Sequence, residues 1–326
     1  MEEDLEKMQD NQTPKYVIFS GGIGGAKLIE GFYESVDPRE IAVISNTGDD
    51  IIQFGLRICP DIDIVIYTLS NMVNKKHLWG LEGDTFSCLN MLKTFYGAGA
   101  DWFHIGDKDF ATHIYRTEML KKGYKLSNVI QNIIDKLKVK CQIFPMAEEY
   151  IPTRLETDLG TLHFEEYFVK YQTRPKIRKI IYGGSNDVMI PEKIDSTLSQ
   201  CEKIIIAPSN PFLSIQPILE IPFYKEILKK NKKKVIAVTP IIKGRAVKGP
   251  TISNMKSMGL EPTSWGVAKY YQEFISKYVF DESEVMADLD IIIEKYRKCG
   301  IEAFPYDTLM NSIKKKKMLA TFIARL

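Results

Sequence analysis

The sequence has few of the residues on which several common classes of protein depend. It contains only five cysteines and four histidines among 326 residues, and neither C-x-x-C nor H-E-x-x-H occurs. Because the cysteines are odd in number and scattered, a disulfide framework and a zinc site of the usual spacing are excluded. No apolar run approaches the roughly 18–20 residues of a membrane helix, and Met1–Pro14 has no apolar signal core. We therefore expect reduced thiols and a cytoplasmic protein.

An excess of charge of one sign is also absent. The chain carries 44 Lys and Arg against 42 Asp and Glu, for a net charge of +2. A protein that coats the phosphate backbone of a nucleic acid is normally strongly basic, so a general nucleic-acid role is disfavoured. The hydrophobic fraction of 44% is that of a folded globular protein. The length allows two domains or one large α/β domain.

Short apolar runs separated by helical segments occur at both ends of the chain. Residues 16–20 and 41–45 form one such pair, and residues 203–207 and 234–238 form another. Runs of this length, bounded by turn residues, are typical of strands buried on both faces of a parallel sheet. We predict an α/β fold with one Rossmann-like, mostly parallel sheet that is flanked by helices and shared by both regions.

The domain organisation follows from this pattern. We interpret residues 1–14 as a disordered tail and residues 15–326 as a single large α/β domain. The centre of the chain changes character, because Arg154–Lys170 suggests a hairpin and Lys176–Tyr182 a further strand. We therefore expect an insertion over about residues 141–182, forming a small β/α element beside the main sheet.

Four glycines stand where the first strand passes into a helix that we expect to begin near Ala26. Glycine permits positive φ and a close approach of a ligand to the backbone, and a helix N-terminus attracts anions. The spacing matches neither G-x-G-x-x-G nor the P-loop, because Lys27 occupies the place of the third glycine. A bound phosphate is the functional interpretation, and tight packing is the structural one. The glycines are Gly21, Gly22, Gly24 and Gly25.

Acidic and amide side chains follow the second predicted strand. Asn46, Asp49 and Asp50 come directly after it, and Asp61 and Asp63 stand a little further along. Carboxylates in a loop at the carboxyl end of a strand could hold Mg²⁺ against a diphosphate. The alternative is that these residues fill turns and cap helices. The pattern alone leaves both interpretations open.

Several other polar loops follow predicted strands or begin helices. Asp84 is expected to cap a helix over Thr85–Phe95, and Asp109 one over Phe110–Lys122. Trp79 could stack on a ring, although a core position is the commoner role of tryptophan. The remaining candidates are Thr85, His104, Asp107 and Arg116, the pair Ser209 and Asn210, and Lys248 in a basic loop. Their shared placement favours one crevice for an anionic ligand.

The motifs together resemble a known family, the 2-phospho-L-lactate transferases of deazaflavin (coenzyme F-420) biosynthesis. The resemblance runs from Tyr16 to about Thr308. It is carried by Ser20–Leu28, Asn46–Asp50, Pro60–Asp63 with Tyr67 and Thr68, Trp79–Phe86, Gly106–Asp109 with Ala111–His113 and Arg116–Thr117, Pro208–Pro211 with Ser214 and Ile215, Lys248–Pro250, and Gly266–Ala268. So many motifs in one order make a chance match very improbable.

This resemblance implies a reaction, a cofactor and a set of site residues. A 2-phospholactyl or phosphoenolpyruvyl group would pass from a guanosine diphospho-ester to the hydroxyl of the deazaflavin Fo, giving F-420-0 and GMP, with Mg²⁺ as cofactor. Asp50 and Asp61 would be the catalytic residues and the metal ligands. The implied substrate-binding residues are Gly22, Gly24, Gly25, Lys27, Asn46, Asp49, Asp63, Trp79, Asp84, Thr85, His104, Asp107, Asp109, Arg116, Ser209, Asn210 and Lys248.

Two departures and one alternative accompany the resemblance. His104 stands where the family has Arg or Lys, and Ile23 where Thr is usual. The alternative is a sister family of similar fold that binds nucleotide sugars and acts in regulation. Its Asp-Asp-Gly-Gly-Ser-Ser-Gly run is expected after the second strand, where this chain has Ile51–Gly55 after Asp50.

We expect small-molecule substrates and neither nucleic acid nor membrane as partner. The acyl donor and the assembly, monomer or homodimer, stay open.

Overall fold

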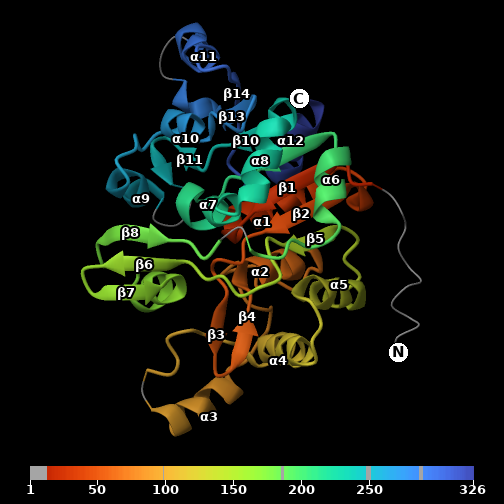
Figure 1. The fold of residues 1–326 in the computed structure, drawn as a ribbon, viewed down its shortest axis with the longest axis vertical. Helices are drawn as coiled ribbons and strands as arrows, with labels where there is room; N and C mark the ends of the chain where they lie inside the picture. The colour runs from red at the N-terminus through yellow and green to blue at the C-terminus, as the bar shows by residue number, and fades with distance from the viewer. Residues whose placement is uncertain (1–12, 98, 185–186, 247–250, 286–288) are drawn as a thin grey trace.

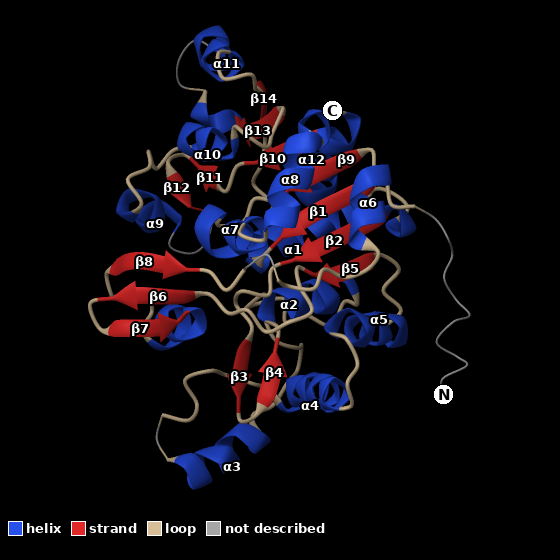
Figure 2. Ribbon diagram, viewed as in Figure 1, coloured by secondary structure: helices blue, strands red, loops and turns tan. Residues whose placement is uncertain are grey.

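The computed structural model describes residues 13–97, 99–184, 187–246, 251–285 and 289–326 (Figure 1). Of the predicted tail, only Thr13 and Pro14 lie within these ranges. The molecule is built around one central sheet with helices on both faces, and smaller antiparallel elements lie at one end of it (Figures 1 and 2).

The central sheet has seven strands in the spatial order β14-β13-β10-β9-β1-β2-β5. All its neighbouring strands pair in parallel. Both predicted β-α-β regions share this sheet, so the predicted fold class is confirmed. The strands are β1 (Tyr16–Ser20), β2 (Ile41–Ser45), β5 (Gln142–Pro145), β9 (Lys203–Ile206), β10 (Val235–Val238), β13 (Lys277–Asp281) and β14 (Glu302–Tyr306).

Two layers of helices bury the two faces of the sheet. Successive strand residues alternate between the faces, so that Ile18 packs in one core while Val17 and Phe19 pack in the other. The face of Ile18 is covered by α1 (Gly22–Tyr33), α2 (Pro60–Leu69), α5 (Leu126–Lys136) and α12 (Ile313–Arg325). The opposite face is covered by α6 (Ile194–Gln200), α7 (Gln216–Leu219), α8 (Pro222–Lys230), α9 (Thr251–Ser257), α10 (Ser264–Tyr271) and α11 (Leu289–Arg297).

A small antiparallel sheet is appended to the main one. It contains β6 (Arg154–Thr157), β7 (Gly160–His163) and β8 (Ile177–Ile181) in the order β7-β6-β8, as the predicted hairpin and strand require. The expected boundary at residue 141 is wrong, however, because β5 belongs to the main sheet. Ile143 and Phe144 of β5 pack in opposite cores, and a run this short cannot be assigned to a sheet from its sequence.

A second hairpin and a helix form an arm that extends from the bottom of the molecule in Figure 1. The hairpin is β3 (Ile51–Gln53) and β4 (Leu56–Ile58), and the helix is α3 (Ser87–Tyr96). Phe54 and Gly55 both have positive φ, as a tight two-residue hairpin turn requires. Helix α4 (Asp107–Lys121) connects the arm to the body through a small core that includes Ile58, Leu89 and Phe110.

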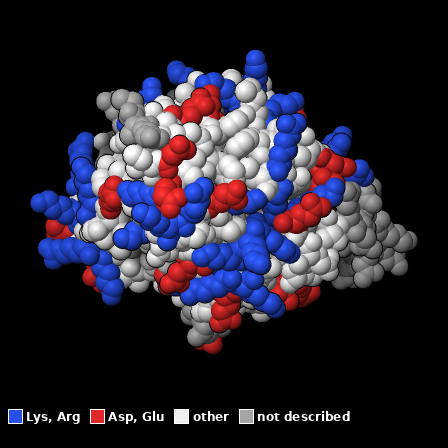
Figure 3. All heavy atoms as spheres, turned by 90° about the horizontal axis from the view of Figure 1, so that it is seen from above, with Lys and Arg blue, Asp and Glu red and all other residues white. Residues whose placement is uncertain are grey.

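Short elements complete the structure. They are β11 (Ile241–Ile242), β12 (Arg245–Ala246), the 3₁₀ turns Pro38–Glu40, Lys232–Lys234 and Glu282–Glu284, and the π turns Glu166–Lys170 and Pro211–Ile215. Of the helices described, none has both the length and the apolar composition to cross a bilayer. On the face shown in Figure 3, basic and acidic side chains are interspersed around uncharged areas, in keeping with the small net charge.

Candidate functional site

The carboxyl ends of the central strands meet at a cavity of about 620 Å³. The chain leaves β1 towards β2 on one side and returns later to β9 on the other, so the gap between β1 and β9 is the topological switch point where α/β sheets bind ligands. Segments that follow five of the central strands line the cavity: Gly21–Gly24 after β1, Asp49 after β2, Pro208–Asn210 after β9, Thr239 and Pro240 after β10, and Thr308–Asn311 after β14.

The glycine segment forms the first turn of α1 rather than a loop before it. The helix begins at Gly22 and not near Ala26, and Gly22 has a φ of +64°, which suits glycine. A Cβ atom on Gly24 would overlap the carbonyl oxygen of Pro208, and one on Gly25 would overlap the hydroxyl of Ser20. These glycines therefore let α1 pack closely against β1 and the segment after β9. Gly22 and Gly24 also line the cavity.

A pair of carboxylates is held together at the start of α1. The side-chain amide of Asn46 donates to Asp49 Oδ1 and to Asp61 Oδ2, both at 2.9 Å. The backbone N–H of Gly22 donates to Asp61 Oδ1 at 2.6 Å. Asp49 follows β2, whereas Asp61 lies in the first turn of α2, so two elements bring the carboxylates side by side. Both carboxylates line the cavity, while Asn46 lies behind them.

The environment of this pair favours a positive partner. Burial raises the pKa of Asp61 to about 6. Burial and the negative charges of Asp61 and Glu165 raise the pKa of Asp49. Two ionised carboxylates in a buried site repel one another, and a proton or a cation relieves that repulsion. Their oxygen donors are the type that Mg²⁺ prefers, and a site with two protein carboxylates leaves coordination positions for phosphate and water.

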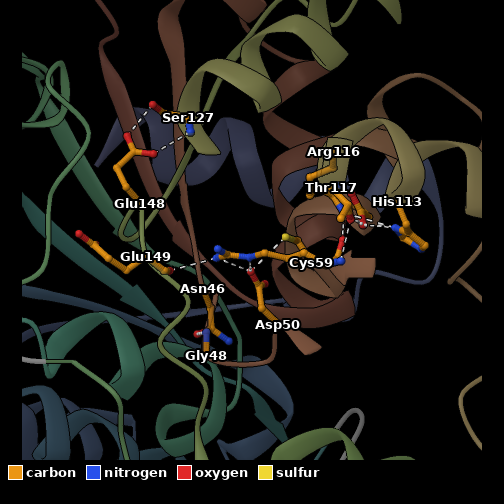
Figure 4. Close-up of polar contacts among 12 residues, drawn as sticks. Asn46, Gly48, Asp50, Cys59, His113, Arg116, Thr117, Ser127, Glu148 and Glu149 are labelled. Carbon is orange, nitrogen blue, oxygen red and sulfur yellow. Dashed lines mark hydrogen bonds and ion pairs between the residues drawn. The ribbon is translucent and has the colours of Figure 1, made fainter. Parts of the chain in front are cut away.

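Asp50 lies elsewhere, although we expected it to act with Asp61. Its side chain is fully buried and does not line the cavity. One oxygen accepts hydrogen bonds from Arg57 Nε at 3.0 Å and Nη2 at 2.9 Å, and the thiol of Cys59 lies 3.0 Å from the same oxygen (Figure 4). The structure thus brings Asp49, and not Asp50, next to Asp61.

Asp63 and Asp109 form a polar wall of the cavity with groups from α2 and α4. The fully buried guanidinium of Arg116 binds both oxygens of Asp63, so Arg116 supports the wall from behind instead of facing a ligand. Asp109 accepts a hydrogen bond from the hydroxyl of Tyr67 at 2.7 Å, and His113 Nε2 lies 3.3 Å from the same oxygen. Burial disfavours ionised Asp109, but the neighbouring His113 ring, the hydrogen bond from Tyr67 and the positive charge of Arg116 outweigh it and lower the pKa of Asp109.

Neither Asp84 nor Asp109 caps the helix that we predicted for it. The start of α4 is capped by Asp84, which precedes α3, and the start of α3 is capped by Asp107, the first residue of α4. Asp84 accepts hydrogen bonds from the backbone N–H groups of Lys108 and Asp109 at the start of α4, at 2.8 and 3.2 Å. Asp107 accepts from those of Ser87 and Cys88 at the start of α3, at 3.0 and 2.9 Å. The sequence rule looks for a cap just before its own helix and cannot detect this exchange. Asp84 and Asp107 do not line the cavity.

The structure divides the predicted site residues into two groups. Those that line the cavity are Gly22, Gly24, Lys27, Asp49, Asp61, Asp63, Trp79, His104, Asp109, Ser209 and Asn210. Those that do not line it are Gly25, Asn46, Asp50, Asp84, Thr85, Asp107 and Arg116. Lys248 lies outside the described residues. Trp79 is 47% exposed, so it is available as a stacking surface and is not part of the core.

The sequence did not point to the cavity residues that come from the appended sheet. Phe164, Glu165 and Phe168 line the cavity directly after β7. We expected a strand to continue through Lys170, but β7 ends at His163 and a π turn follows. The available signal was a pair of acidic residues, Glu165 and Glu166, flanked by aromatic residues, and Glu165 is the buried member of the pair.

The chain is similar to known proteins over most of its length. Residues 16–323 match the family described as 2-phospho-L-lactate transferase CofD. The 2-phospho-L-lactate transferase of Methanosarcina mazei is 35% identical over 309 residues, or 95% of this chain and 99% of that protein. A phosphoenolpyruvate transferase of Streptomyces coelicolor is 34% identical over 261 residues, or 79% of this chain and 82% of that protein. A solved upf0052-family structure from Bacillus halodurans has a TM-score of 0.60, covers 96% of this chain and 99% of its own, and is 13% identical, which concerns the fold alone.

Proposed function

The chain belongs to the 2-phospho-L-lactate transferase family, and on this premise we propose that it transfers a phospholactyl or phosphoenolpyruvyl group to the hydroxyl of the deazaflavin Fo. The donor is a guanosine diphospho-ester, GMP leaves, and the product is F-420-0. Relatives named for each acyl group match the chain at 35% and 34% identity, so both donors belong in the test.

The observation that carries this proposal is the carboxylate pair in the cavity. Attack of an alcohol on phosphorus requires positioning and neutralisation of charge more than a covalent intermediate. Asp49 and Asp61 would hold Mg²⁺, which neutralises the diphosphate when it is bound. Within the described ranges, no group of three or more His, Cys, Asp or Glu side chains could hold a metal. A two-carboxylate site that is completed by substrate phosphate and water agrees with that finding.

The remaining cavity groups suit the other parts of the substrates. The N-terminus of α1 carries a partial positive charge that favours a diphosphate, and Lys27 on the same helix adds a full one. Trp79, Phe103 and Phe168 supply aromatic surface for the flat rings of a deazaflavin or a guanine. A cavity of about 620 Å³ is in the usual size range for small-molecule sites.

The test is direct. The purified protein is incubated with Fo, Mg²⁺ and either the lactyl or the enolpyruvyl guanosine donor, and the products are weighed by mass spectrometry. We expect GMP together with Fo enlarged by one phospho-acyl group, and no product in excess chelator. Absence of product with both donors would contradict the proposal. In that case a nucleotide sugar that co-purifies with the protein would support the regulatory alternative.

We also propose that the protein acts as a homodimer in the cytoplasm. All five cysteines are free thiols, which suits a reducing compartment. The arm exposes large apolar side chains: Met91, Phe95 and Tyr96 on α3 are 57%, 75% and 67% exposed. Exposed apolar surface of this kind marks interaction sites, and a self-complementary contact between two arms would cover it.

A further inference from the structure

One buried carboxylate of the cavity has no partner. Five carboxylates line the cavity, and four of them accept hydrogen bonds from side chains or backbone: Asp49, Asp61, Asp63 and Asp109. The fifth is Glu165, which is 5% exposed. In the part of the chain that the structure describes, no group donates a hydrogen bond to its carboxylate. Burying an acidic side chain without a hydrogen-bond partner destabilises the folded state, so such a side chain in a cavity indicates a contact with a ligand.

Glu165 is held in place through its backbone. Its N–H donates to Nδ1 of His163 at 3.1 Å, and Nε2 of the same ring lies 3.0 Å from the carbonyl oxygen of Asp50. Because Nδ1 accepts, the ring proton of the neutral imidazole is on Nε2, which donates to Asp50. Burial lowers the pKa of His163 and keeps this neutral form. The ring therefore joins the appended sheet to the segment that carries Asp49.

Glu165 lines the same cavity as the carboxylate pair. Burial raises its pKa to about 8, and the negative charges of Asp61 and Asp50 raise it further. The negative charge of Glu165 in turn raises the pKa of Asp49. The oxygens of Asp49 and Asp61 are engaged by Asn46, by Gly22 and, in the proposed function, by the cation. A general base needs a free lone pair that faces the substrate, and among the described residues Glu165 is the one cavity carboxylate whose two oxygens accept no hydrogen bond.

We infer that Glu165 is the catalytic residue that accepts the proton of the attacking hydroxyl group. This inference rests on the proposed function. The hydroxyl oxygen of Fo forms a bond to the phosphorus that carries the acyl ester. The bond from that phosphorus to the bridging oxygen breaks, and its electron pair leaves with GMP. The hydroxyl proton moves to a carboxylate oxygen of Glu165, so atoms and charge balance.

The experiment compares three variants with the wild type. Glu165→Gln keeps the size but cannot accept a proton, and we expect kcat to fall about 100-fold or more, while KM for Fo changes by less than about threefold. Glu165→Asp keeps a proton acceptor but withdraws it by one methylene, and its kcat should lie between that of the wild type and that of Glu165→Gln. Glu156→Gln makes the same chemical change on β6, outside the cavity, and should leave kcat unchanged.

Two further measurements separate the outcomes. Thermal unfolding reports whether each variant is folded, and Fo fluorescence reports binding without turnover. A folded Glu165→Gln variant that binds Fo but turns it over at near the wild-type rate would overturn the inference and leave the proposed function intact. If Glu165→Gln does not fold, a wild-type kcat in Glu165→Asp has the same meaning. A wild-type protein that forms no product with either donor overturns the proposed function and this inference with it.

Discussion

At the scale of single residues, two adjacent aspartates have different surroundings. Asp49 faces the cavity beside Asp61, whereas Asp50 faces a buried guanidinium. Neighbours along a chain point in different directions, so only one of the two could join Asp61. The difference matters for chemistry, because a carboxylate that is fully buried away from the cavity and paired with an arginine is a poor ligand for a metal or a substrate hydroxyl.

Replacement of an aspartate by asparagine is therefore predicted to reduce turnover at Asp49 and Asp61 but to reduce stability at Asp50. Asp49→Asn can still accept the Asn46 hydrogen bond, and Asp61→Asn keeps one oxygen that can accept from either Asn46 or Gly22. Both variants should therefore fold but lose at least about 100-fold in kcat, since several kcal/mol of charge stabilisation disappear. Asp50→Asn leaves Arg57 buried without its counter-ion and should lower the free energy of unfolding by about 3–5 kcal/mol. Steady-state kinetics and urea unfolding measure the two effects. A stable Asp50→Asn that has lost turnover, with an active Asp49→Asn, would reverse our assignment.

The cavity carboxylates also predict how stability depends on pH. The folded pKa is about 6 for Asp61 and about 8 for Glu165, above their ordinary values of 3.8 and 4.5, and that of Asp49 is raised too. The native state therefore holds protons that the unfolded chain releases, so stability falls as pH rises from about 4 to about 8. Asp109, whose pKa is lowered, acts below this window. Burial lowers the pKa of His163 from 6.5, so this one group opposes the trend below that pH, whereas the three carboxylates act together.

The measurement is urea unfolding in chelator at about pH 5.5 and about pH 8. We expect a lower midpoint at the higher pH, a smaller difference in Glu165→Gln, and recovery at the higher pH on adding Mg²⁺, which binds the ionised carboxylates. An unfolding midpoint that rises between these pH values in the metal-free protein would contradict the raised pKa values.

At the scale of elements, the exchange of caps makes α3 and α4 depend on one another. Asp84→Ala should destabilise the start of α4, and Asp107→Ala the start of α3, each by about 0.5–2 kcal/mol. Because α3 lies in the arm, its loss of helix should appear as faster amide hydrogen exchange over Ser87–Tyr96 in Asp107→Ala. Serine at either position can still cap and serves as the control. If exchange over Ser87–Tyr96 became faster in Asp84→Ala but not in Asp107→Ala, then Asp84 would be the cap of α3 and the exchange of caps would be wrong.

At the scale of the whole molecule, the exposed surface of the arm predicts self-association. Phe95→Glu places a charge on a side chain that is 75% exposed, so the folded monomer should tolerate it while an apolar contact between copies should not. Light scattering should give the mass of a dimer for the wild type and of a monomer for this variant. Ile291→Glu on α11, a side chain that is 68% exposed, is the matched control and should stay dimeric. A monomeric wild type would contradict the proposal.

The sequence by itself determined the family and four of the seven strands of the main sheet, which are β1, β2, β9 and β10. Runs such as Tyr16–Ser20 and Ile41–Ser45 can bury both faces only in a covered parallel sheet, and motifs such as Asn46–Asp50 are local strings that can be recognised without a structure. The same local character explains why a hairpin was predicted within Arg154–Lys170, since its turn residues stand between its strands, although the hairpin itself ends at His163.

The tertiary structure alone decided which side chains meet. The assignment of β5 to the main sheet depended on burial in two cores, and the capping of α4 by Asp84 on a contact across 24 positions. The link from His163 to Asp50 spans 113 positions and brings Glu165 into the cavity. Patterns of sequence record the preferences of neighbouring residues. They do not record which distant segments pack together, and the candidate site consists of contacts between such segments.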